Sequence, residues 1–283
     1  MNISRRFIAA AAYPLARIYQ SLFPGIRILM YHRVANCSNY DQLVVSPYHF
    51  EQQMAYLHKH YRVLSLDQAI DDLEQGSCQP GVVVTFDDGY LDNLHNALPI
   101  LKKYNIPATI FITTAFCDQS ISHSRYSDDK QRVHLNWDEV CRLAEEPGIT
   151  IGSHTISHPF LSRINAERSQ MEIRDSKKII EGKLDKTVNY FCYPSGDFLD
   201  KELEFVKQAG YRAAVTVSPG CNHSLLRPYT LKRTEVNNKD GINEMRYKLA
   251  GAFDPFHILL HWRRRQHFKK QSREIKQSYK EAS

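Results

Sequence analysis

The 283-residue sequence predicts an α/β protein in which a parallel sheet is wrapped by helices within one large domain. From about residue 26, short runs rich in β-branched and aromatic residues alternate with longer segments of helical periodicity. The run from Val82 to Phe86 is continuously apolar, which is typical of a strand buried on both faces. No apolar stretch approaches the roughly 18 to 20 residues that span a bilayer, so we do not expect a multi-pass membrane protein.

Residues 1–25 are expected to form an amphipathic helix. Apolar side chains recur at helical spacing between Phe7 and Phe23 and leave polar side chains on another face. Two arginines precede this stretch, as in a signal sequence, but Pro14 and Arg17 interrupt it. We therefore expect a helix that either lies on a membrane surface or docks on the main domain.

The main domain is expected over residues 26–250. Its predicted strands, in chain order, cover residues 26–34, 82–86, 108–112, 149–152, 190–193, 213–217 and 231–236. Its predicted helices are one opened by the cap Ser46 and by Pro47, and others over residues 66–74, 93–104, 137–146, 165–184 and 200–209. Residues 117–134 are polar and rich in Ser, Asp and His, which predicts a long surface loop of the kind that shapes substrate access.

Four polar side chains follow two of the predicted strands at the point where each strand ends. Asp87 and Asp88 come directly after the apolar run, and His154 and His158 follow the strand that ends near residue 152. Because the carboxyl ends of parallel strands meet at one rim, we expect these side chains to lie close together. Two imidazoles at i and i+4 would face the same way on one helical turn.

Two neutral imidazoles and one carboxylate form a site for a borderline metal such as zinc, with positions left open for water and substrate. Adjacent carboxylates raise each other's proton affinity, and a divalent cation removes that penalty. If Asp88 binds the metal with His154 and His158, Asp87 is left free to accept a proton from water. The metal lowers the pKa of that water from about 15.7 toward about 7. Taken alone, an Asp-Asp-Gly sequence is typical of a tight turn.

Two segments resemble signatures of a known family, the polysaccharide deacetylases of carbohydrate esterase family 4. The segment Thr85–Gly89 (TFDDG) resembles the first signature, and His154–His158 (HTISH) resembles the second. The resemblance covers about residues 26–250 and implies a distorted β/α barrel with about seven strands. It also implies that Asp87 is the catalytic base and that the metal, most simply zinc, is held by Asp88, His154 and His158.

A third segment, Phe191–Gly196, resembles the third signature with two departures. Cys192 stands where the family commonly has Arg, and Ser195 stands where it has Tyr. The resemblance implies that Tyr193 and the backbone N–H of Ser195 serve the substrate and the tetrahedral oxyanion, and a backbone N–H survives a change of side chain. Because the usual Arg is missing, we predict that Arg233 orients the base in its place.

Hydrolysis of an N-acetyl group also needs an acid to protonate the leaving amine. Residues 31–34 (YHRV) resemble the opening of the branch that includes poly-N-acetylglucosamine deacetylases, which implies His32 on the first strand as the acid. His261 superficially resembles a C-terminal His motif of other relatives, but it lies beyond the last predicted strand and next to a basic segment. We therefore favour His32 over His261.

Residues 251–283 are expected to form a basic tail. From Trp262 to Ser283 there are eight Lys and Arg against two Glu, an excess equal to the net charge of +6 of the whole chain. We expect a solvated end that can contact anionic lipid. No aromatic ladder or recognition-helix pattern accompanies it, so we expect no nucleic-acid partner. Six widely spaced cysteines predict free thiols and favour a cytoplasmic location, or a peripheral one at the cytoplasmic membrane, over export.

The leading hypothesis is a metal-dependent hydrolase that removes N-acetyl or O-acetyl groups from a polysaccharide or a lipid-linked glycan. The alternative is a non-catalytic carbohydrate-binding barrel associated with a membrane surface, which the altered third signature favours. The intact aspartate pair and histidine pair favour the enzyme, and its expected partner is an acetylated glycan.

Overall fold

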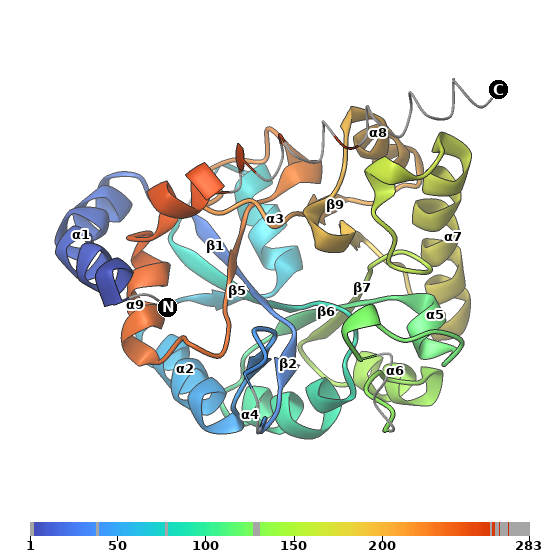
Figure 1. Cartoon of the computed structure of the whole chain (residues 1–283), viewed down its shortest axis with the longest axis horizontal. Coiled ribbons are helices and arrows are strands. Elements are labelled where there is room, and N and C mark those ends of the chain that lie inside the picture. The colour runs from blue at the N-terminus through green and yellow to red at the C-terminus, as the bar shows by residue number, and fades with distance from the viewer. Residues whose placement is uncertain are drawn as a thin grey trace.

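The centre of the molecule is a parallel sheet that closes almost completely into a barrel (Figure 1). The computed structural model describes residues 3–37, 40–76, 79–126 and 131–260, together with positions 262, 263, 266 and 271. The sheet has the strand order β10-β1-β5-β6-β7-β8-β9, and every pairing along it is parallel. Its strands are β1 (Ile26–Tyr31), β5 (Gly81–Phe86), β6 (Ala108–Ile112), β7 (Ile149–Ser153), β8 (Tyr190–Cys192), β9 (Ala213–Val215) and β10 (Arg233–Glu235).

The last gap in the barrel is bridged by backbone contacts between β9 and the segment that leads into β10. Val215 forms a parallel bridge with Leu231, and the Arg233 N–H donates to the Ser218 carbonyl at 2.8 Å. β10 then pairs with β1, in the register Ile28 to Arg233. The sequence expectation of a distorted seven-strand β/α barrel is therefore confirmed.

Three short strands lie off this path. β4 (Val63–Leu64) pairs with β5, while β2 (Arg33–Val34) and β3 (Val44–Val45) form a separate two-stranded sheet. The single strand predicted over residues 26–34 is thus interrupted at His32, which lies between β1 and β2. This interruption places His32 at the carboxyl end of β1, at the rim of the barrel.

The helices surround the barrel, and the cap predicted at Ser46 and Pro47 is present. Ser46 accepts a hydrogen bond from the His49 N–H at 3.3 Å, and Pro47 occupies the first helical position. Ser65 and Asn136 each form a reciprocal capping box with the residue three positions on. The helices are α1 (Ile3–Leu22), α2 (Pro47–His60), α3 (Leu66–Glu74), α4 (Leu98–Lys103), α5 (Thr114–Cys117), α6 (Trp137–Ala144), α7 (Ala166–Leu184), α8 (Asp200–Gln208) and α9 (Ile242–Ala250).

Short helical turns complete the rim. A π-helical turn, Asn93–Ala97, runs directly into α4, so the helix predicted over residues 93–104 has two parts. The remaining turns are 3₁₀ helices at Ser124–Tyr126, Leu161–Arg163, Pro194–Gly196 and Pro228–Thr230. Residues 254–260 are also helical.

The core is continuous from the barrel to the inner faces of the helices. The residues of β1, β5 and β6 are all buried, in agreement with strands that are covered on both sides. Phe50, Met54 and Leu57 of α2 pack into the same cluster as Tyr31 and Phe86 at the strand ends. The rim that carries the polar residues is therefore supported from beneath by a close-packed aromatic layer.

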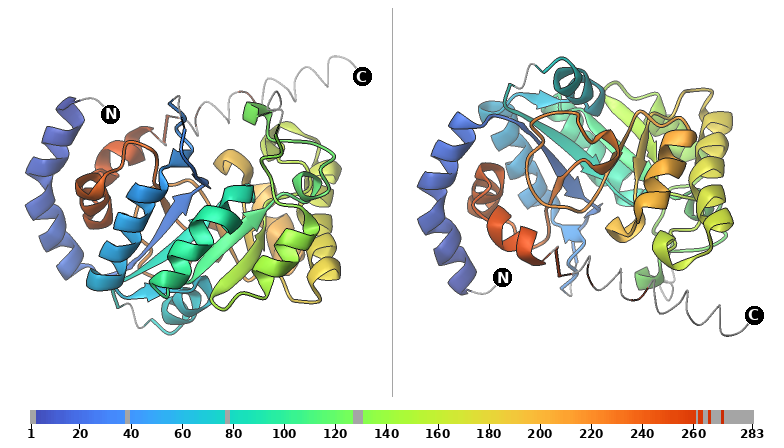
Figure 2. Two further views of the ribbon diagram at one scale, coloured as in Figure 1. Left: turned by 90° about the horizontal axis from the view of Figure 1, so that it is seen from below. Right: turned by 90° about the horizontal axis from the view of Figure 1, so that it is seen from above.

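The first helix and the last long described helices lie on one side of the barrel. Figures 1 and 2 show α1 at one edge of the molecule beside α9, with α7 at the opposite edge. The folded body extends past position 250, because Ala252 and Phe253 are buried and Arg27 forms an ion pair with Asp254 at 2.9 Å. Most of the expected tail after residue 260 lies outside the described residues. Among the described helices, none combines the length and the apolar character needed to cross a bilayer.

Candidate metal centre and active site

The turn after β5 places two carboxylates side by side at the rim. The Asp87 N–H donates to the Tyr31 carbonyl at 3.0 Å and so continues the pairing of β5 with β1. The next two residues, Asp88 and Gly89, have φ values of 70° and 60° and turn the chain sharply. A Cβ atom on Gly89 would lie 2.9 Å from Ile112 Cγ2, so a glycine is needed there for space as well as for conformation.

Asp88, His154 and His158 converge at this rim. Asp88 Oδ1 lies 3.4 Å from His154 Nε2 and also 3.4 Å from His158 Nε2. That oxygen is buried and has no hydrogen-bond partner within the described part of the chain. A tetrahedral metal with bonds of about 2.1 Å holds its ligand atoms about 3.4 Å apart. The spacing of the three side chains therefore suits the ligands of one divalent metal ion better than it suits hydrogen bonds between them.

The two imidazoles meet through a turn and not through a helix, so the expectation of a shared helical face is wrong. Thr155 and His158 have φ values of 71° and 57°, and the His158 N–H donates to Thr155 Oγ1 at 3.0 Å. Glu172 of α7 accepts hydrogen bonds from the Ile156 N–H at 3.0 Å and from the Ser157 N–H at 2.9 Å. This buried carboxylate fixes the turn that presents His158.

Hydrogen bonds orient the rings for ligation. His154 Nδ1 donates to the Cys192 carbonyl at 2.7 Å, so its Nε2 faces Asp88 as a potential ligand atom. A third imidazole, that of His134, bonds through Nδ1 to the Asp88 carbonyl at 3.1 Å and accepts the His123 N–H at its Nε2. Such outer contacts fix ring orientation and tautomer in metal sites.

Burial and neighbouring charges set the protonation of the three converging side chains. Burial by itself raises the pKa of Asp88, but His154 and His158 hold it well below its ordinary value. Burial lowers the pKa of His158 to about 4, so this ring is neutral near pH 7. Burial also acts to lower the pKa of His154, yet Cys192 and Asp88 together raise it. Because a metal binds the neutral imidazole, a bound cation would compete with protonation of His154.

Arg233 lies against Asp87, where the sequence analysis expected an arginine to orient this carboxylate. Arg233 Nη1 and Nη2 donate to the two oxygens of Asp87, each at 2.7 Å, in a bidentate pair that is almost completely buried. Arg233 also donates to the Thr216 carbonyl at 2.9 Å and to Thr85 Oγ1 at 3.1 Å. Burial by itself raises the pKa of Asp87, and Arg233 lowers it below its ordinary value, so Asp87 is a carboxylate.

Cys192 completes the surroundings of this pair. Its Sγ lies 3.1 Å from Arg233 Nη2 and 3.5 Å from Asp87 Oδ2. Asp87, His154 and Cys192 also come close enough to hold a metal. However, burial raises the pKa of the Cys192 thiol, and Arg233 already occupies both oxygens of Asp87. The cluster of Asp88, His154 and His158 is therefore the better metal site.

His32 follows the end of β1, the strand that pairs with β5, so it lies on the strand end next to the carboxylates. Its charge acts to lower the pKa of both Asp87 and Asp88, which places its ring near the pair. Its Nδ1 is buried and has no hydrogen-bond partner among the residues that are described. The alternative acid, His261, falls outside the described residues.

The loop of the third signature forms a tight turn at the rim and directs the ring of Tyr193 into the core. Ser195 lies in a tight turn with φ 54°, closed by a hydrogen bond of 2.9 Å from the Gly196 N–H to the Tyr193 carbonyl. The Tyr193 ring is fully buried and stacks on Phe198 at 4.4 Å, so a direct substrate contact for this side chain is not supported. The expected role of Tyr193 is corrected to one in the core, because the aromatic ring is covered on all sides.

The loop over residues 117–134 lies closer to the site than its polar composition predicts. Its residues Tyr126 and His134 are buried, and His134 stacks on Tyr90 and packs against Phe116. The description as a surface loop is therefore wrong for this part of it. The sequence gives one weak signal that this segment lies near the site, which is the presence of His123 and His134 within it.

Backbone strain is concentrated at the rim. Seven non-glycine residues in the described ranges have clearly positive φ, and four of them belong to the site loops: Asp88, Thr155, His158 and Ser195. Such conformations cost of order 1–3 kcal/mol each and persist where the surrounding structure enforces them. Glu172 and the Thr155 hydroxyl provide that enforcement at the histidine turn.

Comparisons with known proteins agree with this geometry. A family model described as polysaccharide deacetylase matches residues 55–214. The protein YxkH of Bacillus subtilis (strain 168), a polysaccharide deacetylase by name, is 34% identical over 74% of this chain and 71% of its own length. A poly-β-1,6-N-acetyl-D-glucosamine N-deacetylase of Staphylococcus aureus is 27% identical over 72% of this chain and 70% of its own length.

Solved structures show the same fold. A polysaccharide deacetylase from Bacillus cereus superposes with a TM-score of 0.64 at 25% identity, over 80% of this chain and 69% of that one. The deacetylase PplD of Streptococcus pyogenes, in complex with acetate, has a TM-score of 0.70 at 24% identity, over 80% of this chain and 98% of that one. The second likeness bears on the fold alone.

Proposed function

This chain belongs to the polysaccharide deacetylase family, and on that premise we propose that it hydrolyses N-acetyl groups of an amino-sugar glycan with the help of a divalent metal, most simply zinc. The family and the enzyme class that the sequence predicts, a carbohydrate deacetylase, are confirmed at the level of the family. One observation carries the proposal: Asp88 Oδ1 lies equally far from two imidazole nitrogens, beside a carboxylate that Arg233 holds.

Asp88, His154 and His158 would hold the metal. When bound there, a divalent cation supplies Lewis acidity toward an acetyl carbonyl and lowers the pKa of water. The hydrogen bonds from His154 to Cys192 and from the 156–157 turn to Glu172 hold two of these residues in place before any ligand arrives. The protein thus provides an ordered set of one anionic and two imidazole donors.

The remaining residues move protons. Hydrolysis adds water across the C–N bond of the acetamide and gives acetate and a free amine. Asp87, ionised and oriented by Arg233, accepts a proton from the attacking water. His32, at the end of the neighbouring strand β1, is suited to deliver a proton to the amine nitrogen as the C–N bond breaks. The backbone N–H of Ser195 is proposed to stabilise the developing oxyanion.

A groove beside the site offers room for the sugar. A cavity of about 420 Å³ opens next to Arg233, lined by Tyr40, Gln42, Glu235, Asn237 and Lys239 among others. Lys239 Nζ lies 4.6 Å from the exposed ring of Tyr40. Polar groups around an exposed aromatic ring suit the hydroxyls and apolar face of a sugar. Together with the relative that is named for poly-β-1,6-N-acetyl-D-glucosamine, this favours an N-acetylglucosamine polymer or its lipid-linked precursor.

The proposal is tested by acetate release from acetylated oligosaccharides. Oligomers of β-1,6-linked N-acetylglucosamine, chitin oligomers and O-acetylated glycans are compared, each with and without chelator. We expect release from an N-acetylated oligomer, loss of release with chelator, and no release by the Asp87→Asn variant. Metal and glycan binding without release from any substrate would instead establish the non-catalytic carbohydrate-binding protein.

A further inference from the structure

Helix α1 is apolar on two faces, one turned toward the protein and one turned outward. The inner face is made of small residues: Ala9 is buried against Ala252 and Phe253, and Ala12 and Ala16 pack beside it. The outer face carries large side chains that contact no core, among them Leu15 and Leu22, which are 71% and 68% exposed. A helix that only docks on a protein buries its large side chains, so this outer face is built for another environment.

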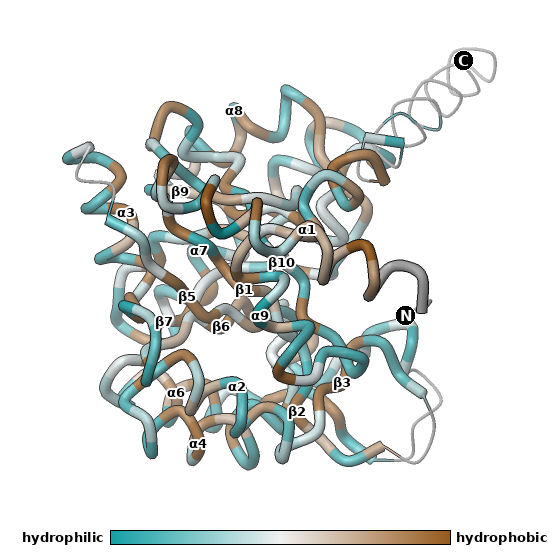
Figure 3. The backbone as a smooth tube through the Cα atoms, turned by 90° about the vertical axis from the view of Figure 1, so that its left-hand side faces the viewer, coloured by the Kyte–Doolittle hydropathy of each residue, from teal (hydrophilic) through white to brown (hydrophobic). Residues whose placement is uncertain are grey.

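The exposed side chains form one continuous surface. Leu15, Ile18 and Leu22 follow a spacing of three and four and therefore share one face of α1. The neighbouring 254–260 helix adds Ile258, and Figure 2 shows this helix beside α1. Between them lies an apolar groove of about 550 Å³, lined by Leu15, Tyr19, Phe23 and Ile258 among others. The same side of the molecule faces the viewer in Figure 3.

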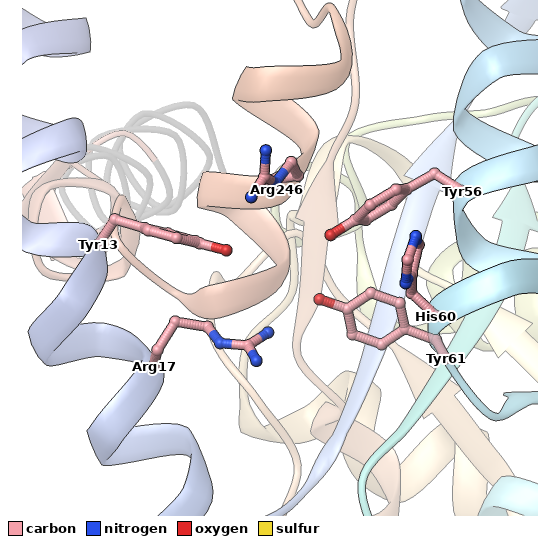
Figure 4. A pocket seen from close by; sticks show the side chains of 6 residues that line it. All are labelled: Tyr13, Arg17, Tyr56, His60, Tyr61 and Arg246. Carbon is pink, nitrogen blue, oxygen red and sulfur yellow. The ribbon is translucent and has the colours of Figure 1, made fainter.

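A cavity of different character lies on the other flank of α1. It measures about 500 Å³ and is formed between α1, α9 and the end of α2, with Tyr13, Arg17, Tyr56, His60, Tyr61 and Arg246 as its lining. Figure 4 shows the hydroxyl groups of the three tyrosines and the guanidinium of Arg17 pointing toward one another across it.

The charge of this cavity is not balanced by the protein. Among the described residues, no carboxylate lines it. Neither Arg17 nor Arg246 forms a salt bridge with an acidic residue in the described part of the chain. Two guanidinium groups and three phenolic hydroxyls make a donor-rich site of the kind that binds a phosphate group.

We propose that α1 and the 254–260 helix bind the surface of an anionic phospholipid bilayer, with a lipid phosphate in the cavity of Arg17 and Arg246 and the outer apolar face of α1 among the acyl chains. An interfacial helix places its large apolar side chains at the acyl boundary and its arginines at the phosphate level. In α1, Leu15 and Leu22 are exposed on the apolar face, and Arg17 lines the cavity on another flank of the same helix.

Charge argues for a bilayer as the occupant over a second copy of the chain. α1 carries three arginines and no Asp or Glu, and Arg246 lines the cavity beside it. Two such surfaces would repel each other across a dimer interface, whereas anionic lipid attracts each basic residue near its surface. The bilayer site lies beside the barrel, and the 254–260 helix also reaches the groove proposed for the sugar through His257 and Leu260, so vesicle binding is measured without any substrate.

Vesicle flotation with the full-length protein tests the proposal. Vesicles of phosphatidylcholine alone are compared with vesicles that also contain phosphatidylglycerol. We expect binding to the anionic vesicles. Arg17→Gln with Arg246→Gln should weaken it about 30-fold, since each basic residue near an anionic surface contributes about fivefold. Leu15→Glu with Ile18→Glu should weaken it at least about 100-fold, because two large apolar side chains are lost from the acyl region.

Matched controls on the opposite edge of the molecule separate this site from general charge and general apolarity. Arg142→Gln with Arg174→Gln removes two exposed arginines from α6 and α7, and Met171→Glu alters an exposed apolar residue of α7. These variants should bind the vesicles as the wild type does. Circular dichroism checks that each variant is folded, and all the substituted residues of α1 are at least half exposed or lie at an open cavity.

Three results would overturn the proposal. If the α1 variants bound the vesicles as strongly as the wild type does, the apolar face of α1 would have no part in membrane binding. Equal loss in the control pair on α6 and α7 would reduce the effect to net charge. A wild-type dimer that dissociates on the Leu15→Glu with Ile18→Glu change, together with no vesicle binding, would assign the face to a second copy of the chain.

Discussion

Replacing Arg233 by Met removes a buried cation while it keeps much of the side-chain volume. Arg233 makes two hydrogen bonds of 2.7 Å to Asp87 and further ones to Thr216 and Thr85, and its side chain is fully buried. Asp87 is left in the same buried position without its partner. The substitution therefore tests both the stability of the barrel and the orientation of the proposed base.

The size of the effect follows from the burial of the pair. Breaking a buried ion pair by removing one partner costs about 3–5 kcal/mol, because the other charge remains buried and unpaired. For a domain of this size that corresponds to a fall in Tm of roughly 10 °C. The turnover number should fall by about 100-fold, as expected when a proton acceptor is misplaced by about 1 Å.

The pH dependence has a defined sign. Burial raises the pKa of Asp87 and Arg233 brings it below the ordinary value. A lowered pKa stabilises the wild type above the unfolded-state pKa, and this contribution is lost as pH falls through the folded-state value. Without Arg233, burial dominates and raises the pKa of Asp87, so the variant gains stability as pH falls. The difference between the two proteins is therefore largest near neutral pH and narrows in acid.

Urea unfolding at about pH 7 and about pH 4 measures this difference. Arg212→Met is the matched control, because Arg212 also contacts two carboxylate oxygens, those of Asp71 and Glu74, but at the surface. Its cost should be about 1 kcal/mol or less. The reasoning is refuted if Arg233→Met costs no more than this control, or if its cost does not decrease in acid.

Further expectations follow from the same site. Removal of metal by chelator should lower the free energy of unfolding, measured by calorimetry, by about 4 kcal/mol relative to protein with metal at 1,000 times Kd. The Asp88→Asn variant should show no such change on addition of chelator. His32→Gln should keep its metal content and KM but lose about 10² to 10⁴ in kcat; an unchanged kcat would reject His32 as the acid. Glu172→Gln should weaken metal binding by about 10 to 100-fold in a competition titration, whereas Glu167→Gln, an exposed residue of the same helix, should leave it unchanged.

The barrel could be predicted from the sequence because most of its strands are short apolar runs with clear ends. Residues 108–112 and 66–74, for example, were predicted with the bounds that the structure has. Capping residues such as Ser46 and Ser65 act locally, so their effect depends on few other parts of the chain. The histidine turn failed as a prediction because a spacing of four reports nothing about φ, and Thr155 and His158 both adopt left-handed values.

Helix α9 escaped prediction for a different reason. Its buried side includes Glu244 and Lys248 beside Met245 and Leu249, so no apolar stripe of the usual width exists. The Lys248 ammonium is compensated by Asp240 and by the Glu235 carbonyl, both of which precede the helix in sequence. Buried charges with distant or non-helical partners cannot be distinguished from exposed ones in a sequence pattern.

Arg233 shows how far a departure from a family signature can be interpreted physically. The strand predicted around it is short and mostly polar. A buried arginine in a strand that closes a barrel needs an acidic partner, because an unpaired buried charge is costly. β8 and β10 both end at the rim that carries Asp87, and Cys192 Sγ lies 3.1 Å from Arg233 Nη2. A guanidinium can therefore reach the same carboxylate from either strand. What the chemistry requires is a set of atoms at the rim, and more than one backbone position can supply each of them.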